Sequence, residues 1–469
     1  MSLAHADVTN ELDRRTQDPD VAAIKRGWDF LTQQAVLTSD FDQSTIDQLY
    51  LSWPEPLRSE AESMSIEERR QMTLQRYGLT PRPTHRVEAN PISGEVVSRF
   101  DQAPSDCVTP LQYVVDASSN WTMNCFACHG GTVYGKPTPG APNNRYALQT
   151  LTDELRTTKF KIGKPLARME LGSLLVPLGT THGTTNAVVF GMGLMHYRDE
   201  ELNVVDRMPA QFTHHDMDAP PWWHFHKRPY LYIDGFAQKG HRGLMQFTMI
   251  PENDASFFRE HEKDFEDVYA FISSLRAPKF DGEINHSLAR QGELIFNDHC
   301  SQCHGTYGTN ETYPNRMVAL EDIGTDPVRA NALTVEGRSK YARSWFAHAS
   351  EPDEQTTITD PDGYVAPPLD GVWASAPYFH NGSVPTLWHV LHPNERPEIW
   401  RPVDQLMDSE RIGISIEILD RIPLMHPDVA FRRTVFDTRR FGKGNEGHWY
   451  PDALDESEKR SVLEYLKTL

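Results

Sequence analysis

Four of the five cysteines occur in two copies of one spacing, in which two residues separate the cysteines and a histidine follows directly. On one helical turn the two sulfurs of such a copy face the same way, so both can add to the vinyl groups of one porphyrin. The adjoining imidazole can then ligate the iron. The spacing therefore predicts two covalently attached c-type haems, with the two histidines as proximal iron ligands. The predicted haem-binding residues are Cys125, Cys128 and His129 in the first motif and Cys300, Cys303 and His304 in the second.

Other uses of paired cysteines fit this pattern less well. A zinc site keeps its half-sites about 12 to 20 residues apart, whereas the two motifs lie in different halves of the chain. A redox dithiol or a disulfide would need neither His129 nor His304. The remaining cysteine, Cys107, is expected to be a small buried free thiol rather than a functional one.

Length and composition narrow the class of protein. At about 150 residues per domain, the 469 residues correspond to about three structural units. Lys and Arg total 46 against 66 for Asp and Glu, and the net charge of −20 repels the phosphates of nucleic acids and anionic lipids. Hydrophobic residues at 38% and aromatic residues at 10% are typical of a packed globular protein. We expect no nucleic-acid partner and, since no apolar run reaches about 18 residues, no membrane span.

The predicted haem chemistry also bears on localisation. Covalent haem attachment of this kind takes place outside the cytoplasm, so we expect a periplasmic or otherwise exported protein. The chain begins with neither a basic segment nor an apolar segment of the kind found in export signals. The signal peptide is therefore expected to be absent from this chain.

The residue pattern predicts a mainly α fold in which regular strands are scarce. The proline-rich residues 79–120 and the glycine-rich residues 130–193 are expected to form long irregular loops around the first haem. Periodic apolar residues and capping residues indicate helices within four stretches. These stretches are residues 12–78, residues 255–275, the segment from His286 to the second motif, and the chain end after Asp455 and Glu458. In the first stretch Ser65 and Glu68 form a capping box, and Gly78 ends the last helix.

The order of motifs and helices predicts the domain organisation. Each motif has a closing helix downstream, which is the order expected of two cytochrome c-like haem domains in tandem. A short polar linker over residues 278–285 indicates a boundary near residue 282. The predicted units are an N-terminal helical extension over residues 1–78, a first haem domain over 79–281 and a second over 282–469.

Several local motifs resemble one known group of proteins. The helix with Gly292 and Phe296, the haem turn, the loop over residues 376–387 and the closing helix together resemble the bacterial diheme cytochrome c peroxidase superfamily. The segments 140–143, 220–222 and 444–448 are most similar to its rubber-oxygenase-like branch. The resemblance extends from about residue 75 to the end of the chain.

The resemblance implies an oxidoreductase. Peroxidases of this superfamily join an electron-storing haem to a haem that reacts with hydrogen peroxide, whereas the rubber oxygenases bind dioxygen at the reactive haem. The motif of His129 is flanked by Gly130, Gly131 and long irregular segments without an obvious ligand-bearing turn, so we expect its haem to be the reactive one. The haem of His304 would then store electrons, and an electron-donor or acceptor redox protein would be the partner. The alternative is a non-catalytic diheme electron-transfer protein in which both irons are six-coordinate. An oxidase that acts on a protein or an organic substrate would share the same chemistry.

The sixth iron ligands decide between these functions, because an open position lets peroxide or dioxygen bind. The methionine that superfamily peroxidases use for the second haem would fall near Asn394, and this sequence lacks it there. The resemblance points instead to His448, on a glycine-rich turn. Nearby alternatives for the second haem are His389, His392, Met407 and Met425. Candidates for the first haem, none of which stands out, are Met192, Met195, His214, His215, His241 and Met245.

The resemblance assigns roles to three further residues. Trp222, which Trp223 follows, would lie between the haems and relay electrons, and the alternative is an ordinary core or surface tryptophan. Phe236 would line the distal pocket of the first haem. His380 would lie beside the second haem without ligating it, on a tight turn made by the following Asn-Gly pair. The simpler interpretation of that loop is a helix start, with Ser383 as the cap of a helix that begins at residue 384.

Overall fold

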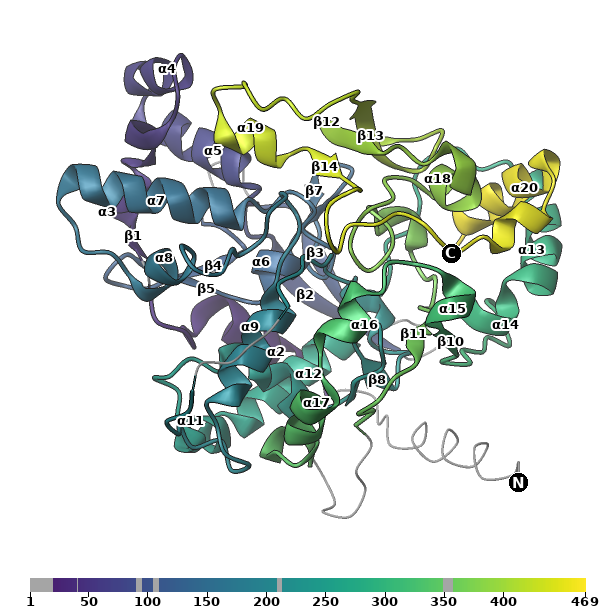
Figure 1. The fold of residues 1–469 in the computed structure, drawn as a ribbon, viewed down its shortest axis with the longest axis horizontal. Helices are drawn as coiled ribbons and strands as arrows, with labels where there is room; N and C mark the ends of the chain where they lie inside the picture. The colour runs from purple at the N-terminus through teal and green to yellow at the C-terminus, as the bar shows by residue number, and fades with distance from the viewer. Residues whose placement is uncertain (1–19, 40, 90–94, 104–108, 209–212, 349–356) are drawn as a thin grey trace.

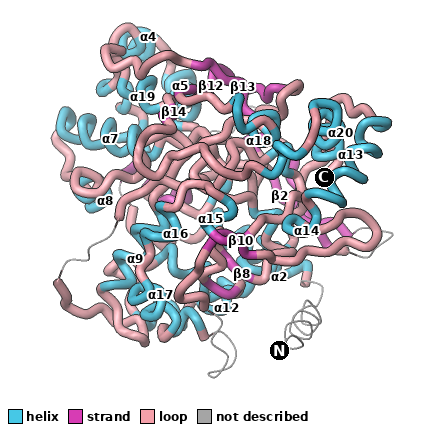
Figure 2. Tube along the Cα trace, turned by 45° about the vertical axis from the view of Figure 1, so that its right-hand side comes forward, coloured by secondary structure: helices cyan, strands magenta, loops and turns pink. Residues whose placement is uncertain are grey.

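The structure is a computed structural model that describes residues 20–39, 41–89, 95–103, 109–208, 213–348 and 357–469 (Figure 1). Cys107, for which the sequence predicts a buried thiol, lies outside these residues. The described chain is mixed but mainly helical, and long irregular segments connect its elements (Figure 2). None of the helices in these ranges combines the length and the apolar character that a membrane span requires.

The helices are mostly short. The α-helices are α2 (Val21–Gln33), α3 (Gln43–Ile46), α4 (Leu57–Ser63), α5 (Ile66–Tyr77), α6 (Phe126–His129), α7 (Leu148–Ile162), α8 (Arg168–Gly172), α9 (Ala187–His196), α10 (His241–Met245), α11 (Ala255–Glu260), α12 (Glu262–Ser273), α13 (His286–His299), α14 (Ser301–His304), α15 (Leu320–Ile323), α16 (Val328–Ala332), α17 (Val335–Ala342), α18 (Leu387–Leu391), α19 (Val429–Arg433) and α20 (Glu456–Leu466). The 3-10 helices are η2 (Leu49–Ser52), η3 (Trp222–His224), η4 (Gln246–Thr248), η5 (Trp345–Ala347), η6 (Val372–Ala374), η7 (Pro393–Glu395) and η8 (Tyr450–Ala453).

The strands form small antiparallel sheets. They are β1 (Phe41–Asp42), β2 (Thr84–Ala89), β3 (Val96–Asp101), β4 (Tyr113–Val115), β5 (Asn120–Met123), β6 (Thr132–Val133), β7 (Lys136–Pro137), β8 (Tyr230–Leu231), β9 (Ala237–Gln238), β10 (Met317–Ala319), β11 (Gly363–Val365), β12 (Ile399–Asp408), β13 (Gly413–Ile418) and β14 (Phe436–Asp437). Two sheets have three strands, in the orders β1-β5-β4 and β13-β12-β14, and the other strands pair as hairpins or as β10 with β11. Strands are thus more frequent than the sequence pattern predicted.

The predicted helix ends are largely confirmed. Ser65 and Glu68 form a capping box at the start of α5, and Gly78 ends that helix in the left-handed conformation. Asp455 and Glu458 form a capping box at the start of α20. The helix predicted over residues 255–275 is divided into α11 and α12, because His261 leaves the helical conformation and its Nδ1 lies 2.7 Å from an oxygen of the Asp264 carboxylate.

The prediction of irregular loop for residues 79–120 is wrong in part. Strands β2 and β3 pair in register from Thr84 with Asp101 to Ala89 with Val96, and β4 pairs with β5. Prolines flank these strands instead of interrupting them, so the backbone donors of the ladder remain available. The hairpin packs onto α2 through His85, whose ring centre lies 5.1 Å from that of Trp28.

The helix predicted to begin at residue 384 begins later. Val384 pairs with Tyr378 in an antiparallel bridge, with both backbone N–H groups donating across it. Helix α18 starts at Leu387, and the side chain of Thr386, rather than Ser383, accepts the capping hydrogen bond from the backbone of His389. The bridge holds residue 384 in extended backbone, which is why the helix starts after it.

Two pairs of helices cross at glycines. Helix α2 packs against α12, and an added Cβ at Gly27 would lie 2.1 Å from the carbonyl oxygen of Asp267. Helix α13 packs against α20 on the right of Figure 1, and an added Cβ at Gly292 would lie 1.9 Å from the carbonyl oxygen of Ser461. Each crossing therefore needs a residue without a side chain for the backbones to approach so closely. One crossing lies in the part of the chain that carries the first motif, and the other in the part that carries the second.

The hydrophobic core consists of three clusters. One joins Ile24 and Trp28 of α2 to Phe126 of the first motif, to α12 and to Tyr341 of α17. A second surrounds α13, α18 and α20, and a third lies under α5 and α7. Helix α2, which the sequence assigns to an N-terminal extension, thus packs around the first motif. The predicted division at residues 78 and 282 stays a prediction.

Candidate functional site

The first motif forms a short helical turn with half-buried cysteines. Cys125 and Cys128 flank the start of α6 and are not joined as a disulfide. Burial raises the pKa of the Cys125 thiol to about 12 and that of Cys128 to about 11, so both are protonated at neutral pH. Because Asn143 donates its backbone N–H to the Cys128 carbonyl oxygen at 2.8 Å, the segment 140–143 lies against the motif.

The imidazole of His129 is fixed by the segment that begins at Pro220. Its Nδ1 lies 3.0 Å from the carbonyl oxygen of Pro220, which can only accept, so Nδ1 carries the proton. Burial lowers the pKa of His129 to about 4, which keeps the ring neutral. Trp222 stacks on this ring with centres 4.7 Å apart and planes 24° apart. The neutral ring thus leaves the lone pair of Nε2 free for a metal.

The second motif repeats this arrangement with a different segment. His304, the last residue of α14, places Nδ1 2.8 Å from the carbonyl oxygen of Pro367, and burial lowers its pKa. Both motif histidines are therefore neutral rings held by a proline carbonyl. Such a bond orients the ring and fixes its tautomer, as outer partners of metal-bound histidines do.

A hydrogen-bonded connection joins the two histidine-holding segments. In η3, which follows Pro220 and Pro221, Trp223 donates from Nε1 to the carbonyl oxygen of Asp370 at 2.8 Å. His224 places Nε2 2.9 Å from the same oxygen, and burial lowers its pKa to about 3. Asp370 lies three residues after Pro367, the partner of His304. Trp222 thus contacts the first motif, while Trp223 and His224 bind the backbone of the segment that holds the histidine of the second motif.

His448 lies opposite His304. Their ring centres are 6.2 Å apart and their planes are inclined by 61°. An imidazole that binds iron through nitrogen places its ring centre about 3 Å from the metal, so two axial imidazoles on one iron have centres about 6 Å apart. Burial, His304 and Arg396 lower the pKa of His448 to about 3, and its buried Nδ1 has no hydrogen-bond partner in the described chain. These two neutral nitrogen donors fit the axial positions of a haem.

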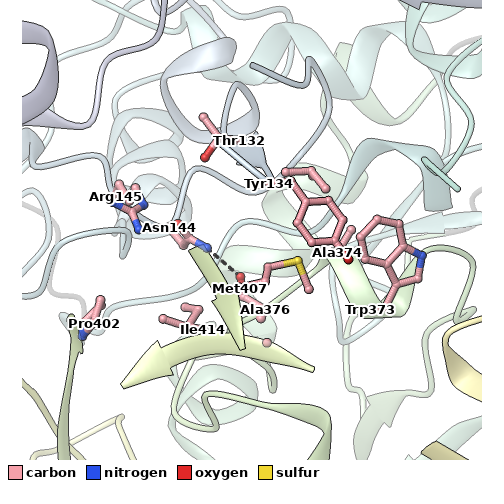
Figure 3. Close-up of a pocket in the computed structure, with 12 residues that line it drawn as sticks. Thr132, Tyr134, Asn144, Arg145, Trp373, Ala374, Ala376, Pro402, Met407 and Ile414 are labelled. Carbon is pink, nitrogen blue, oxygen red and sulfur yellow. Dashed lines mark hydrogen bonds between the residues drawn. The ribbon is translucent and has the colours of Figure 1, made fainter. Parts of the chain in front are cut away.

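The alternatives for the second haem lie in different surroundings. His392 uses both ring nitrogens, Nδ1 with the Trp388 carbonyl at 2.9 Å and Nε2 with Glu456 at 3.1 Å. His389 bonds Thr386 through Nδ1 at 2.7 Å. Met425 is 94% exposed. Met407 lines a pocket beside Trp373 and Tyr134, across which Asn144 donates to the Ala376 carbonyl (Figure 3).

The candidates for the first haem remain without an assignment. His241 is paired with Glu262 at 3.0 Å, and His214 Nε2 lies 3.0 Å from the Pro177 carbonyl. Met195 and Met245 are buried in the cluster around α2 and α12, and Met192 packs against its edge. His215 is buried, with Nδ1 bonded to the Thr213 carbonyl and Nε2 without a partner in the described residues.

The loop over residues 376–387 presents two rings to different neighbours. Phe379, at φ +65°, lies 6.1 Å from His448 between ring centres. His380 instead lies 4.5 Å from Tyr364 of β11, and burial lowers its pKa to about 3. The Asn381-Gly382 turn is present as predicted, with Gly382 at φ +69°. The ring of this loop that faces His448 is therefore Phe379, which no motif in the sequence singled out.

Phe236 is buried beside a charged cluster. Its ring lies 4.8 Å from that of Tyr341 and 5.3 Å from the guanidinium of Arg338. Asp234, two residues earlier, pairs with Arg338 at 2.7 Å and with Arg329 at 2.9 Å, all three being fully buried. Sequence reasoning missed this cluster, because the arginines lie far along the chain in α16 and α17.

Arg396 and Asp370 were also missed. Arg396 donates from one nitrogen to the carbonyl oxygens of Asn445 and Gly447, both at 2.7 Å, and so holds the turn that carries His448. Asp370 acts through its backbone, as described above. A side chain that binds backbone carbonyls and a residue that acts through its own carbonyl leave no pattern in the sequence.

The described residues contain no cluster of three or more His, Cys, Asp or Glu side chains suited to a bare metal ion. The donor sets present are instead pairs of thiols with one or two imidazoles, which fit a porphyrin-bound iron.

Comparison with known proteins agrees with this chemistry. Residues 363–401, which include β11, the loop and α18, match a family model described as RoxA-like, cytochrome c-like. The match relates the chain to the cytochrome c superfamily and implies covalently bound c-type haem.

Two curated relatives from Sinorhizobium fredii, both uncharacterized proteins, are similar over part of the chain. The protein y4iM is 30% identical over 241 residues, which are 43% of this chain and 53% of the relative. The protein y4iJ is 28% identical over 261 residues, 42% of each chain. The chain thus spans about half the length of these relatives, whose names state no activity.

Proposed function

We propose that this chain is a diheme c-type cytochrome of the diheme cytochrome c peroxidase superfamily, closest to its rubber-oxygenase-like branch. In this proposal it is an oxidoreductase in which one haem activates hydrogen peroxide or dioxygen and the other stores and transfers electrons. The observation that carries the proposal is an asymmetry between the motifs. A second imidazole, that of His448, faces His304 at 6.2 Å between ring centres, whereas the ring contact of His129 in the described chain is Trp222.

The likeness of the two motif regions supports a haem in each. Both motif histidines donate from Nδ1 to a proline carbonyl, that of Pro220 or that of Pro367. Both regions contain two helices that cross at a glycine, Gly27 in one and Gly292 in the other. Equivalent surroundings built from unrelated segments support the same cofactor at both motifs.

The cofactors would supply redox chemistry at iron, with reactivity at an open axial position and electron storage where both axial positions are filled. The protein's own groups would control access and geometry. His304 and His448 would hold the second iron from both sides and keep small ligands out. His129 would hold the first iron from one side, with its orientation set by Pro220 and Trp222. Phe236 would line the distal side of the first haem, and His380 would lie beside the second without ligating it.

Electrons would pass between the haems through η3. Trp222 stacks on His129, and Trp223 and His224 donate to the Asp370 carbonyl in the segment that binds His304. Reduction of one hydrogen peroxide to two waters takes up two electrons and two protons. An external redox protein would deliver the electrons to the second haem, and the net charge of −20 favours a partner with a basic surface. We place the protein in the periplasm, or another exported location, where c-type haem is attached.

Carbon monoxide binding tests the proposal. The reduced protein, made with a haem-attachment system, should contain two c-type haems per chain by the pyridine haemochrome assay and should bind one carbon monoxide. His129→Gly should abolish that binding while the spectrum of the other haem stays largely intact. Two haems with no carbon monoxide binding would favour the non-catalytic electron carrier, and binding at the haem of His304 alone would reverse the two roles.

A further inference from the structure

The turn that carries His448, residues 444–448, is held by contacts from several segments. Gly444 donates its backbone N–H to the Asp326 carboxylate at 2.9 Å, and Asn381 donates its side-chain amide to the Gly444 carbonyl at 2.9 Å. His448 itself has φ +53° and donates its backbone N–H to the Ile323 carbonyl at 2.6 Å. The preceding Gly447 lies so close to Gly324 that an added Cβ would be 2.3 Å from that backbone.

Arg396 completes this support from the opposite side. One terminal nitrogen donates to the carbonyl oxygens of Asn445 and Gly447, at 2.7 Å each, and Nε donates to the His389 carbonyl at 2.9 Å. The fork of the guanidinium thus ties the turn to α18. The Gly447 carbonyl belongs to the peptide that leads into His448, so the bond fixes the orientation of that peptide. Lysine could not make the same contacts, because an ammonium lacks the planar fork.

Arg396 forms no ion pair in the described chain, although Asp452 acts on it electrostatically and counteracts the effect of burial on its pKa. No carboxylate in the described ranges lies within ion-pair distance of its guanidinium, and all of its hydrogen bonds go to carbonyl oxygens. Burial lowers the pKa of Arg396 to about 10, so the group stays protonated at neutral pH. Its faces are covered by Phe379, at 4.9 Å from the ring centre, and by Trp449, at 5.7 Å. The structure therefore has a positive charge beside the His448 turn that is bonded only to carbonyl oxygens, with Asp452 as a more distant acid.

We propose that Arg396 is a positioning residue for His448 and that its charge raises the reduction potential of the second haem. This inference rests on the proposed ligation of that haem by His304 and His448. A haem iron with two imidazole ligands has a low potential. A fixed cation close to it destabilises the oxidised form more than the reduced form, because the oxidised iron carries one more positive charge. Arg396 would thus raise the reduction potential of the second haem and offset part of the decrease that the second histidine ligand causes.

Two substitutions separate position from charge. Arg396→Gln removes the charge, and Arg396→Lys keeps the charge but loses the fork. In spectroelectrochemical titration of the haem-loaded protein, Arg396→Gln should change the one-electron equilibrium of the second haem about tenfold toward the oxidised form, a drop of about 59 mV. In Arg396→Lys the reduction potential of the second haem should stay close to that of the unaltered protein, because the charge is retained. Both variants should change the low-spin ferric EPR signal, since the turn that carries His448 loses the contacts of the guanidinium fork.

The first haem and a variant at an exposed arginine serve as controls for the Arg396 substitutions. The potential of the first haem should not move in either variant. Arg460→Gln should leave both haems unchanged, since Arg460 is an exposed residue of α20 that is paired with Glu456 at 3.1 Å. An unchanged EPR signal in Arg396→Lys would overturn the positioning role, even if Arg396→Gln failed to load haem. An equal drop in potential in both variants would overturn the role of the charge.

Failure of this inference differs from failure of the proposed function. If His448→Ala left the low-spin spectrum of the second haem unchanged, the ligation would be wrong and the role of Arg396 would fall with it. If His448→Ala opened the iron but Arg396→Gln left potential and EPR signal as in the unaltered protein, the ligation would stand and only this inference would fail.

Discussion

The two motif regions use the same inner arrangement and differ in what faces the histidine. At both, a neutral imidazole donates from Nδ1 to a proline carbonyl. At the second motif the opposite position holds His448, supported by Arg396 and by a turn packed on Gly324. At the first motif the ring contact of His129 in the described chain is Trp222, which stacks on the face of the imidazole, and no second imidazole lies against it among these residues. The difference teaches that a shared attachment motif leaves reactivity undecided, because reactivity depends on the sixth ligand.

Removal of the thiols should have the largest effect. Cys125→Ala with Cys128→Ala, and Cys300→Ala with Cys303→Ala, should each leave one covalently bound haem per chain, because in the proposed function each pair would form the thioether bonds of its own haem. The pyridine haemochrome assay on purified protein measures the count. Two haems remaining in either double variant would show that its motif does not bind haem covalently.

Substitution of His448 should remove the difference between the two regions. His448→Ala should convert the second iron from low spin to an open form, so the reduced protein should bind two carbon monoxide molecules instead of one. His392→Ala serves as the control, because both nitrogens of His392 are already bonded, to the Trp388 carbonyl and to Glu456. If His448→Ala still bound one carbon monoxide per chain, His448 would not be the sixth ligand of the second haem, and Met407 and His389 would be the next candidates.

The helix crossings should be sensitive to one methyl group. In Gly27→Ala the new Cβ would meet the Asp267 carbonyl at 2.1 Å, and in Gly292→Ala it would meet the Ser461 carbonyl at 1.9 Å. Forcing the helices apart should lower the free energy of unfolding by about 1–3 kcal/mol in each variant. Urea unfolding of the haem-loaded protein measures this.

Gly172→Ala, at the end of α8, is the control for these variants, since an added Cβ there meets open space. Its stability should change by less than about 1 kcal/mol. If Gly27→Ala and Gly292→Ala unfolded at the same urea concentration as Gly172→Ala, the prediction that these helix crossings require glycine would be wrong.

Acid should weaken the packing around His182, whose backbone N–H donates to the Arg433 carbonyl oxygen of the C-terminal part at 2.9 Å. Burial, with Arg433 and Arg76, lowers the pKa of His182 to about 3, and its Nε2 lies 3.1 Å from the Thr150 hydroxyl. The unfolded chain binds a proton at this histidine below about pH 6.5, whereas the folded chain does so only below about pH 3. The contribution of His182 is therefore complete above about pH 6.5 and is lost progressively as the pH falls toward 3.

His182→Gln keeps a hydrogen-bonding side chain and removes the titration. The variant should lose less unfolding free energy than the unaltered protein between about pH 7 and pH 4, as measured by urea unfolding at each pH. Parallel pH profiles for the two proteins would contradict the assignment. The comparison with the variant isolates His182, because other buried histidines such as His224 and His380 titrate in the same range in both proteins.

Local order was largely predictable from the sequence. The caps at Ser65 and Asp455 and the helix after His286 are found where the residues indicate them, since a cap depends on side chains within one turn. The hairpin of β2 and β3 was not predicted, because its prolines suggested a loop and its strands gain their stability by packing on α2. The start of α18 was misplaced because the bridge between Tyr378 and Val384 competes with a helix.

The sequence by itself determined the attachment chemistry: two pairs of thiols, each with an adjoining imidazole, at a spacing that one helical turn brings to one side. Such a motif is local, so its geometry follows from the backbone of a few residues. Only the tertiary structure decided what faces each imidazole, because that partner comes from a distant part of the chain. The position of His448 depends on the packing of Gly447 on Gly324 and on the fork of Arg396. These contacts form only when the whole chain is folded, and they leave no spacing in the sequence.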